Sequence, residues 1–491
     1  MSVLRWCVFL WSLALLPASG AVYHVDSERG DDARSGLSPE HAWRSLGKAN
    51  AVDLKPGDGL LFKSGGVWKG RLKPQGGGTA GAAVRIGRYG DGPLPRIDGE
   101  GRHPDAVLLE NLSHVTVSEL EITNTGPRRE PWRTGIRVSA NAAGTVAGVR
   151  LEKLHVRDVN GDLRKDHEGC GIYFEAKGGN GARFDGLVIE NCRVERTDRN
   201  GICQRGTGRL RSRNVIIRGN TLDDIGGDGI KLWGTDGGLI ERNVVRKARA
   251  RCAPNEAAAG IWPFACDDTV IQFNEVSGTI GTKDGQGFDA DYHCRRTIIQ
   301  YNYSHGNEGG FLLVCGPGGT TNSDTVIRYN LSVHDGVKSA RVFHFGGSSQ
   351  RTRIYHNTIV LGPHQDLPMM LFTEWNKGIA RDVVFENNLF IVQPGGRATY
   401  QLEPAEGVAF RNNLFIGRHE GLPEGVATHS GKLRFASDLV PRPGSRSIHG
   451  FRPQGPAFPR GAAIASNGGR DLLGNPLPSG QPAIGAIEPA R

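Results

Sequence analysis

A short apolar strand that ends in asparagine recurs through the chain, and this repeat limits the possible folds more than any other feature. Successive copies lie about 23 to 31 residues apart. Periods of roughly 20–50 residues are typical of solenoids, propellers and other arrays, and a propeller blade needs about four strands in 40 or more residues. The shorter period therefore favours a solenoid. The copies end at Asn191, Asn220, Asn243, Asn274, Asn302, Asn330, Asn357, Asn388 and Asn413.

A second series of short apolar strands lies between the copies of the first, and each of its members opens with glycine. These glycines are Gly171, Gly201, Gly229, Gly260, Gly287 and Gly310. Both series are rich in β-branched and aromatic residues, as strands are, and no part of the array keeps helical spacing. The chain is therefore predicted to be all-β, a right-handed parallel β-helix whose stacked coils align equivalent side chains in columns.

The two columns lead to two structural predictions. Stacked asparagines at one bend are expected to form a ladder of side-chain amides that hydrogen-bond to one another, as amides do in cross-β structures. The glycines are expected at the opposite bend, in a backbone conformation with positive φ that glycine adopts most easily.

With this repeat, the chain resembles the right-handed β-helix repeat proteins of the pectin-lyase-like superfamily over nearly its whole length after the leader. The resemblance implies the fold. It leaves the activity open, because that superfamily contains polysaccharide lyases, glycoside hydrolases, epimerases, esterases and non-catalytic spikes.

The sequence divides into four segments. Residues 1–20 have one positive charge, an apolar core and then small residues, which predicts a secretory signal peptide and a secreted or periplasmic protein. Residues 21–106 are expected to form an N-terminal cap and the first coils, and residues 107–424 the β-helix. Residues 425–491 are rich in proline and glycine and are predicted to form a C-terminal cap.

A short capping helix is predicted after Ser38, which would be its N-cap with Pro39 in the first helical position. Its apolar face would consist of Ala42, Trp43, Leu46 and Ala49. Such a helix would cover the open edge of the first coil.

The net charge of +9 favours an acidic partner, and acidic glycans and nucleic acids are both candidates. No nucleic-acid-binding module surrounds the short basic clusters, so no nucleic-acid partner is expected. No apolar run after the leader is long enough to span a bilayer, so no membrane insertion is expected. We expect a monomer that binds a polysaccharide or oligosaccharide.

Seven cysteines follow the leader, and their spacing fits neither a redox pair nor a zinc cluster. Cys266, Cys294 and Cys315 each follow a glycine-led strand, so they are expected to share one buried column. Cys252 and Cys266 are the best candidates for a disulfide in an exported protein.

Alternation along the glycine-led strands predicts one functional surface. Side chains alternate between the two faces of a strand, so if the isoleucine or phenylalanine after each glycine points inward, every second residue points outward. Lys231, Trp262 and Asp289 would then lie on three successive coils. The predicted outward residues are Tyr173, Glu175, Cys203, Arg205, Lys231, Trp233, Trp262, Phe264, Asp289, Asp291, Leu312 and Val314.

Candidate roles follow from residue type. The predicted catalytic residues are Lys231, Asp289, Asp291, Arg205 and His293. The predicted substrate-binding residues are Trp233, Trp262, Glu308 and Trp375, since sugars stack on aromatic rings. The predicted metal ligands are Asp228, Asp267 and Asp268, with Ca²⁺ as the expected cofactor because it prefers oxygen ligands.

Two mechanisms fit these residues. In the first, Ca²⁺ neutralises a uronate and Lys231 or Arg205 removes its C5 proton, which leads to β-elimination. The motif GDGIKLWG around Lys231 resembles the lysine-plus-calcium arrangement of some β-helical lyases. In the second, Asp289 and Asp291, or one of them with Asp267 or Asp268, act as an acid–base pair with room for a water between them, as in an inverting glycoside hydrolase.

The basic charge and the lysine favour the lyase, acting on an acidic extracellular polysaccharide. The inverting glycoside hydrolase is the alternative, and a non-catalytic glycan-binding protein is a second alternative. No GDD motif paired with a GHG motif is present, so the chain departs from the polygalacturonase pattern.

Overall fold

The computed structural model describes residues 20–491 except 168, 207–209, 254, 320–321, 339, 425, 427–428, 430–432, 456–457, 463, 465–467, 479 and 490–491. The predicted leader therefore lies, apart from Gly20, outside the described residues. None of the described helices is long and apolar enough to cross a membrane.

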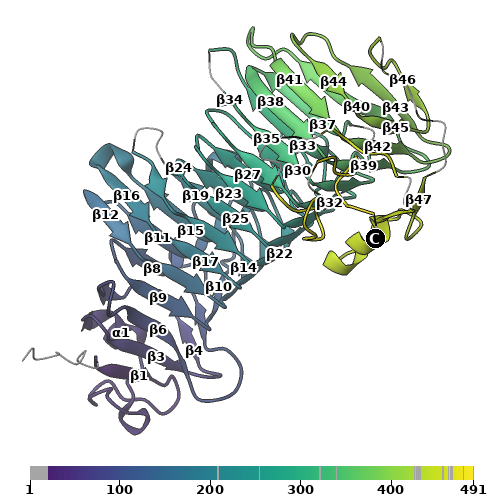
Figure 1. The fold of residues 1–491 in the computed structure, drawn as a ribbon. Helices are drawn as coiled ribbons and strands as arrows, with labels where there is room; N and C mark the ends of the chain where they lie inside the picture. The colour runs from purple at the N-terminus through teal and green to yellow at the C-terminus, as the bar shows by residue number, and fades with distance from the viewer. Residues whose placement is uncertain are drawn as a thin grey trace, which may run out of the picture.

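Three long parallel sheets wind around one apolar core and form the predicted β-helix (Figure 1). From Val84 onward each coil contributes one strand to each sheet, in the order sheet 1, sheet 2, sheet 3. The core is filled by columns of isoleucine, valine, leucine and phenylalanine, such as Ile202, Ile230 and Ile261, all fully buried. The predicted fold class is confirmed.

Sheet 1 consists of β1 (Val22–Val25), β3 (Gly59–Lys63), β6 (Val84–Tyr89), β9 (Val115–Ser118), β13 (Arg150–Glu152), β17 (Val188–Glu190), β21 (Ile216–Arg218), β25 (Leu239–Glu241), β28 (Val270–Gln272), β31 (Ile298–Gln300), β35 (Val326–Arg328), β38 (Ser349–Tyr355), β41 (Arg381–Glu386) and β44 (Ala409–Arg411), with β34 (Asn322–Ser323) paired to β38. Sheet 2 consists of β4 (Val67–Lys69), β7 (Arg96–Asp98), β10 (Glu121–Asn124), β14 (His155–Val159), β18 (Arg193–Thr197), β22 (Thr221–Ile225), β26 (Val244–Arg246), β29 (Glu275–Ser277), β32 (Tyr303–His305), β36 (Leu331–Val333), β39 (Thr358–Leu361), β42 (Leu389–Val392) and β45 (Leu414–Ile416).

Sheet 3, which carries the site described below, consists of β8 (Asp105–Glu110), β11 (Thr134–Ala140), β15 (Cys170–Ala176), β19 (Asn200–Arg205), β23 (Ile230–Trp233), β27 (Ile261–Phe264), β30 (Gln286–Ala290), β33 (Gly310–Gly316), β37 (Phe343–Gly347), β40 (Asp366–Thr373), β43 (Arg397–Gln401) and β46 (His419–Glu420). Smaller sheets are formed by β12 (Gly144–Ala147), β16 (Ala182–Asp185), β20 (Ser212–Arg213) and β24 (Thr235–Asp236), by β2 (Asp53–Leu54) and β5 (Gln75–Gly76), and by β47 (Arg434–Phe435) and β48 (Pro453–Gln454). The helical segments are α1 (Leu46–Ala51) and the 3₁₀ turns Pro39–His41, Lys165–His167, Gly178–Asn180 and Ser445–Phe451.

The predicted asparagine ladder is present at the bend between sheets 1 and 2. The Nδ2 of each ladder asparagine donates to the Oδ1 of the next at 2.9–3.0 Å, from Asn220 to Asn413. Asn191 lies one position outside the ladder, since Cys192 occupies the equivalent place and its backbone N–H bonds to Asn220. The residue before most ladder asparagines has positive φ, as Tyr301 (55°) does.

The prediction that the column glycines have positive φ is wrong for five of the six. Only Gly310 has positive φ, at 119°. The others are needed for close packing between elements. A Cβ atom on Gly201 would lie 2.5 Å from Cδ2 of Leu222 and 2.7 Å from the carbonyl oxygen of Gly229. The strand of sheet 2 that follows in the next coil therefore excludes any side chain at this position.

The N-terminal helix is shorter than predicted. Trp43 pairs with β1 through hydrogen bonds with His24 and Asp26, which holds residues 42–44 extended. Helix α1 therefore begins at Leu46, and its N-cap is Ser45, whose hydroxyl accepts a bond from the N–H of Lys48. The predicted N-cap Ser38 instead precedes the isolated 3₁₀ turn.

The sequence predicted that the C-terminal segment forms a cap. Its described parts lie along the side of the coils. Figure 1 shows this yellow segment beside β32 and β39. Its residues Phe451, Leu472 and Ile487 share an apolar cluster with Tyr303 of β32 and Val360 of β39. The Tyr303 hydroxyl bonds to the carbonyl of Arg442. The segment therefore covers the outer face of sheet 2.

All seven described cysteines are unbridged, so the predicted Cys252–Cys266 disulfide is wrong. Cys266 is fully buried in the core, where its thiol donates to backbone carbonyls, whereas Cys252 is half-buried in an insert. Cys266 and Cys294 both belong to the core, as predicted, but Cys315 faces outward on sheet 3.

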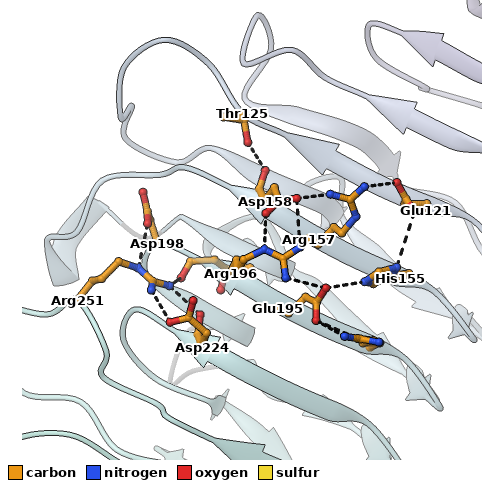
Figure 2. A network of polar contacts seen from close by, with 12 residues as sticks. Glu121, Thr125, His155, Arg157, Asp158, Glu195, Arg196, Asp198, Asp224 and Arg251 are labelled. Carbon is orange, nitrogen blue, oxygen red and sulfur yellow. Dashed lines mark hydrogen bonds and ion pairs between the residues drawn. The ribbon is translucent and has the colours of Figure 1, made fainter.

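An ion-pair network covers part of the outer face of sheet 2 (Figure 2). Arg196 bonds to Asp158 of the preceding coil and to Glu195 of its own strand, and His155 of the preceding coil lies 3.0 Å from Glu195. Charges on this face are therefore paired along the stack.

Candidate active site

A cavity of about 810 Å³ lies over the outer face of sheet 3. It spans the strands from β19 to β37 and the turns beside them. Its lining residues are Lys165, Arg205, Lys231, Trp233, Ala257, Trp262, Phe264, Thr282, Lys283, Asp284, Asp289, Asp291, Tyr292, Leu313, Cys315, Arg341, His344 and Trp375. The structure thus brings together seven of the predicted site residues: Arg205, Lys231, Trp233, Trp262, Asp289, Asp291 and Trp375.

The strand register explains why these side chains meet. Lys231 of β23 pairs with Trp262 of β27. The pairing of Ile261 with Phe288 brings Asp289 of β30 next to Trp262. Neighbouring strands lie about 4.8 Å apart, so residues some thirty positions apart in sequence form one wall.

The predicted register fails at β33. Gly310 pairs with Gln286 and Leu312 pairs with Phe288, one position away from the predicted alignment. Leu312 and Val314 therefore point into the core, and Leu313 and Cys315 line the cavity instead. Phe311 and Leu312 are adjacent and both buried, so simple alternation could not show which one continues the inward column.

Two carboxylates and a thiol form the centre of the cavity. One carboxylate oxygen each of Asp289 and Asp291 and the sulfur of Cys315 all lie within 4.8 Å of one another. The Cys315 thiol donates a hydrogen bond to Oδ1 of Asp291 at 3.2 Å, and the backbone N–H of Tyr292 donates to the same oxygen at 2.7 Å. Both of these bonds are therefore made to the same oxygen of Asp291.

Burial controls the protonation of this pair. Burial, reinforced by the charges of Asp291 and Asp284, raises the pKa of Asp289 well above its ordinary value. Burial also raises the pKa of Asp291 to about 6. Asp289 is only 2% exposed and accepts one bond, from Nε2 of Gln286 at 3.2 Å. The two carboxyl groups therefore titrate as a pair in which burial favours the protonated form, most strongly at Asp289.

Cations and indole rings alternate along one side of the cavity. The guanidinium of Arg205 lies 5.1 Å from the ring centre of Trp132 and 5.8 Å from that of Trp233. The ammonium of Lys231 lies 5.6 Å from Trp233 and 5.7 Å from Trp262. These distances suit cation–π contacts, so the rings hold the cations in place.

Trp262 is anchored from behind. Its indole N–H donates to Oδ1 of Asp228 at 3.0 Å, and Asp228 is fully buried with Arg199 as its ion-pair partner. The ring of Trp262 is therefore fixed in the cavity wall.

Aromatic residues close the opposite side. Trp375 lies over Gly346, where a Cβ atom would meet the indole ring at 2.5 Å. Its ring also contacts His344 and Tyr292 edge to face. Burial lowers the pKa of His344 to about 3, so this imidazole is neutral.

Two predicted residues are not part of the cavity lining. His293 is exposed and contacts the edge of the Phe264 ring from outside. Glu308 bonds to the backbone of Gly281 and pairs with Lys338 at 3.0 Å. Their predicted roles have no support in this geometry.

The three predicted metal ligands do not meet. Asp228 holds Trp262, Asp267 pairs with Arg211 and Arg295, and Asp268 pairs with Arg296. Among the described residues, the potential donors close enough to share an ion are Asp289, Asp291 and Cys315. Burial keeps the Cys315 thiol protonated by raising its pKa, so this group does not fit Ca²⁺, which takes six to eight oxygen ligands.

Sequence reasoning missed the residues that the turns contribute. Lys165 comes from a 3₁₀ turn, Asp284 from the turn before β30, and Arg341 from the turn before β37. Asp284 is a third carboxyl group that lines the cavity, and burial raises its pKa. These turns do not repeat, so no column in the sequence could reveal them.

The chain is similar to known carbohydrate-active proteins. It is 29% identical over 508 residues to a lacto-N-biosidase of Bifidobacterium longum subsp. longum; the alignment covers 82% of this chain and 31% of that protein, so the chain spans about a third of its length. Two crystal structures of a GH136 lacto-N-biosidase from Eubacterium ramulus match with TM-scores of 0.62 and 0.61. Their identities are 27% and 25%, and the matches cover 74% and 79% of this chain and 67% and 68% of theirs.

These relatives contradict the predicted calcium-assisted lyase, because lacto-N-biosidases are glycoside hydrolases. The basic net charge and Lys231 had favoured elimination, but neither feature is specific to lyases. The family model described as "right handed beta helix region" matches residues 102–245 and 134–359, which together span more than half of the 491 residues. The chain therefore belongs to the right-handed β-helix family.

Proposed function

We propose that this protein is a retaining glycoside hydrolase that cleaves an oligosaccharide in the cavity over sheet 3. The observation that carries the proposal is the approach of the Asp289 and Asp291 carboxylates to within 4.8 Å inside an aromatic-walled cavity. Retaining enzymes hold their two carboxyl groups about 5–5.5 Å apart, and inverting enzymes about 6.5–9.5 Å apart. The nearest oxygens of the pair are closer together than the carboxyl groups of an inverting enzyme, so we favour retention over the inverting geometry expected from the sequence.

Asp291 is assigned as the nucleophile. Near neutral pH it is mostly ionised, since its pKa is about 6, and both of its hydrogen-bond donors bind Oδ1. Oδ2 is left to attack the anomeric carbon. The new C–O bond forms as the bond to the leaving oxygen breaks, which gives a glycosyl ester on Asp291.

Asp289 is assigned as the general acid. Burial raises its pKa, which favours the protonated carboxyl group that a general acid needs, and this proton passes to the leaving oxygen. The carboxylate then takes a proton from a water molecule that attacks the ester, which releases the sugar and restores both residues. Asp284 is the other carboxyl group of the cavity that could serve as the acid.

The tryptophans and cations would bind the sugar rather than react. Trp233, Trp262 and Trp375 line the cavity, and Arg205 and Lys231 supply hydrogen-bond donors beside Trp233 and Trp262. Since the chain resembles lacto-N-biosidases, an aryl lacto-N-bioside is the first substrate to assay. The predicted leader would make the natural substrate an extracellular glycan.

The test compares Asp291→Asn, Asp289→Asn and Asp284→Asn with the wild type on this substrate and on a panel of neutral and acidic oligosaccharides. We expect Asp291→Asn to lose roughly 10⁴-fold in kcat and Asp289→Asn about 10²–10⁴-fold. Azide should restore turnover in Asp289→Asn with a glycosyl azide of retained configuration. Azide rescue of Asp284→Asn instead would move the acid role to Asp284.

If Asp291→Asn is as active as the wild type, the proposal is refuted. Binding of oligosaccharides with no turnover on any member of the panel would favour a non-catalytic glycan-binding protein.

A further inference from the structure

The backbone around Asp291 is fixed by one buried side chain. Asn322 of β34 is fully buried, and its Nδ2 donates to the carbonyl oxygens of Ala290, Asp291 and Cys315. The Oδ1 of Asn322 accepts a bond from the Thr325 hydroxyl at 2.9 Å. The same amide therefore holds the strand end that carries Asp291 to the strand that carries Cys315.

This arrangement brings the Cys315 thiol into hydrogen-bond contact with Asp291. Ala290 pairs with Val314 in the register, so the residues that follow them, Asp291 and Cys315, lie side by side and on the same face. Cys315 is 1% exposed and lies 3.2 Å from Oδ1 of Asp291. The other described cysteines do not line the cavity.

The hydrogen bond has two consequences for the carboxylate. A donor bound to an ionised carboxylate favours the ionised form, and it offsets part of the effect of burial. It also occupies Oδ1 together with the N–H of Tyr292, which fixes the rotation of the carboxyl group and directs Oδ2 away from both donors.

We propose that Cys315 is a positioning residue, whose thiol orients the Asp291 carboxylate and maintains it in the ionised form required for attack. The proposal rests on the proposed function, because it gives Cys315 a role only if Asp291 is the nucleophile. The thiol itself forms no bond to the substrate and undergoes no redox change.

The test uses Cys315→Ala and Cys315→Ser, with Cys294→Ala as the matched control. Cys294 is a buried core cysteine one coil away that does not line the cavity. The thiol donates to a charged group, and loss of such a bond weakens the function of that group, so we expect Cys315→Ala to lose about tenfold in kcat/KM at pH 7. The acidic limb of its pH profile should move to higher pH, while KM changes little.

Cys315→Ser should restore most of the rate and return the acidic limb toward that of the wild type, because a hydroxyl can donate the same bond. Thermal unfolding of each variant shows whether a loss of rate reflects folding. If Cys315→Ala does not fold, the pH profile of Cys315→Ser is compared with that of the wild type. A shift of more than one pH unit in the acidic limb of Cys315→Ser would overturn the proposal.

Unchanged rate and unchanged pH profile in Cys315→Ala would also overturn it. If Asp291→Asn is inactive and Cys315→Ala behaves as the wild type, only the role of Cys315 fails. If Asp291→Asn is active, the proposed function itself fails.

Discussion

Asp228 accepts a hydrogen bond from the indole N–H of Trp262 at 3.0 Å, and so connects a fully buried ion pair to the wall of the cavity. The sequence suggested Asp228 as a metal ligand, whereas the structure gives it the task of orienting an aromatic ring. This contact leads to the first prediction.

Asp228→Ala should weaken both folding and substrate binding. Asp228 is one of two carboxylate partners of the fully buried Arg199, the other being Glu256 at 4.0 Å. Removing one partner of a buried ion pair costs up to about 3–5 kcal/mol. Trp262 also loses its anchor, so KM should rise more than kcat falls. Denaturant unfolding and steady-state kinetics measure the two effects. A variant with unchanged stability and unchanged KM would show that Asp228 does not hold Trp262.

Asp291 should make the protein more stable as the pH falls. Its pKa is about 6 in the folded state and about 3.8 when unfolded, so the folded state binds the proton more tightly. The destabilising contribution is fully present above pH 6 and disappears as the pH falls toward 4. Each unit of difference between the two pKa values corresponds to about 1.4 kcal/mol in the free energy of unfolding.

Asp291→Asn should therefore be more stable than the wild type at pH 7, and the difference should shrink on acidification. Urea unfolding at pH 7, 6 and 5 measures it. A wild-type stability advantage at pH 7 would contradict the raised pKa.

Asn302→Ala should destabilise the stack. The side chain of Asn302 accepts bonds from the backbone and side chain of Asn274 and donates to Asn330 and to the carbonyl of Ile271. Each buried group left without a partner costs about 1–3 kcal/mol. Asn191→Gly is the control, since Asn191 is exposed at the same bend, has a φ of 53° that glycine tolerates, and lies outside the ladder. Equal thermal shifts in both variants would argue against the ladder.

Gly201→Ala should destabilise the stack by overpacking. The new Cβ would lie 2.5 Å from Leu222 and 2.7 Å from the backbone oxygen of Gly229, and overpacking of this kind costs typically 1–3 kcal/mol or more. Gly81→Ala is the control because nothing lies within 4 Å of its added Cβ and its φ is not positive. Thermal unfolding should separate the two, and similar midpoints would contradict the packing explanation.

The features that repeat could be read from the sequence, because a column needs only one residue type at one offset. The asparagine ladder and the wall of Lys231, Trp262 and Asp289 follow from this periodicity. The register of β33 could not be read, since Phe311 and Leu312 satisfy the inward pattern equally well.

The chemistry could be predicted only in part. Asp289 and Asp291 interrupt an apolar strand pattern, and this interruption identified them. The spacing between their carboxylates depends on side-chain rotation, which sequence separation does not specify; the backbone distance suggested room for a water, whereas the oxygens converge to within 4.8 Å. Lys165, Asp284 and Arg341 come from turns of irregular length, whose path depends on the packing of the finished coils.

The central claim is that Asp289 and Asp291 hydrolyse a glycosidic bond by double displacement. Proton NMR of the anomeric region during the first minutes of turnover tests it most directly, because it identifies the first-formed product before mutarotation. We predict a product hemiacetal with the anomeric configuration of the substrate. A first product of inverted configuration, or an unsaturated sugar in its place, would contradict the account.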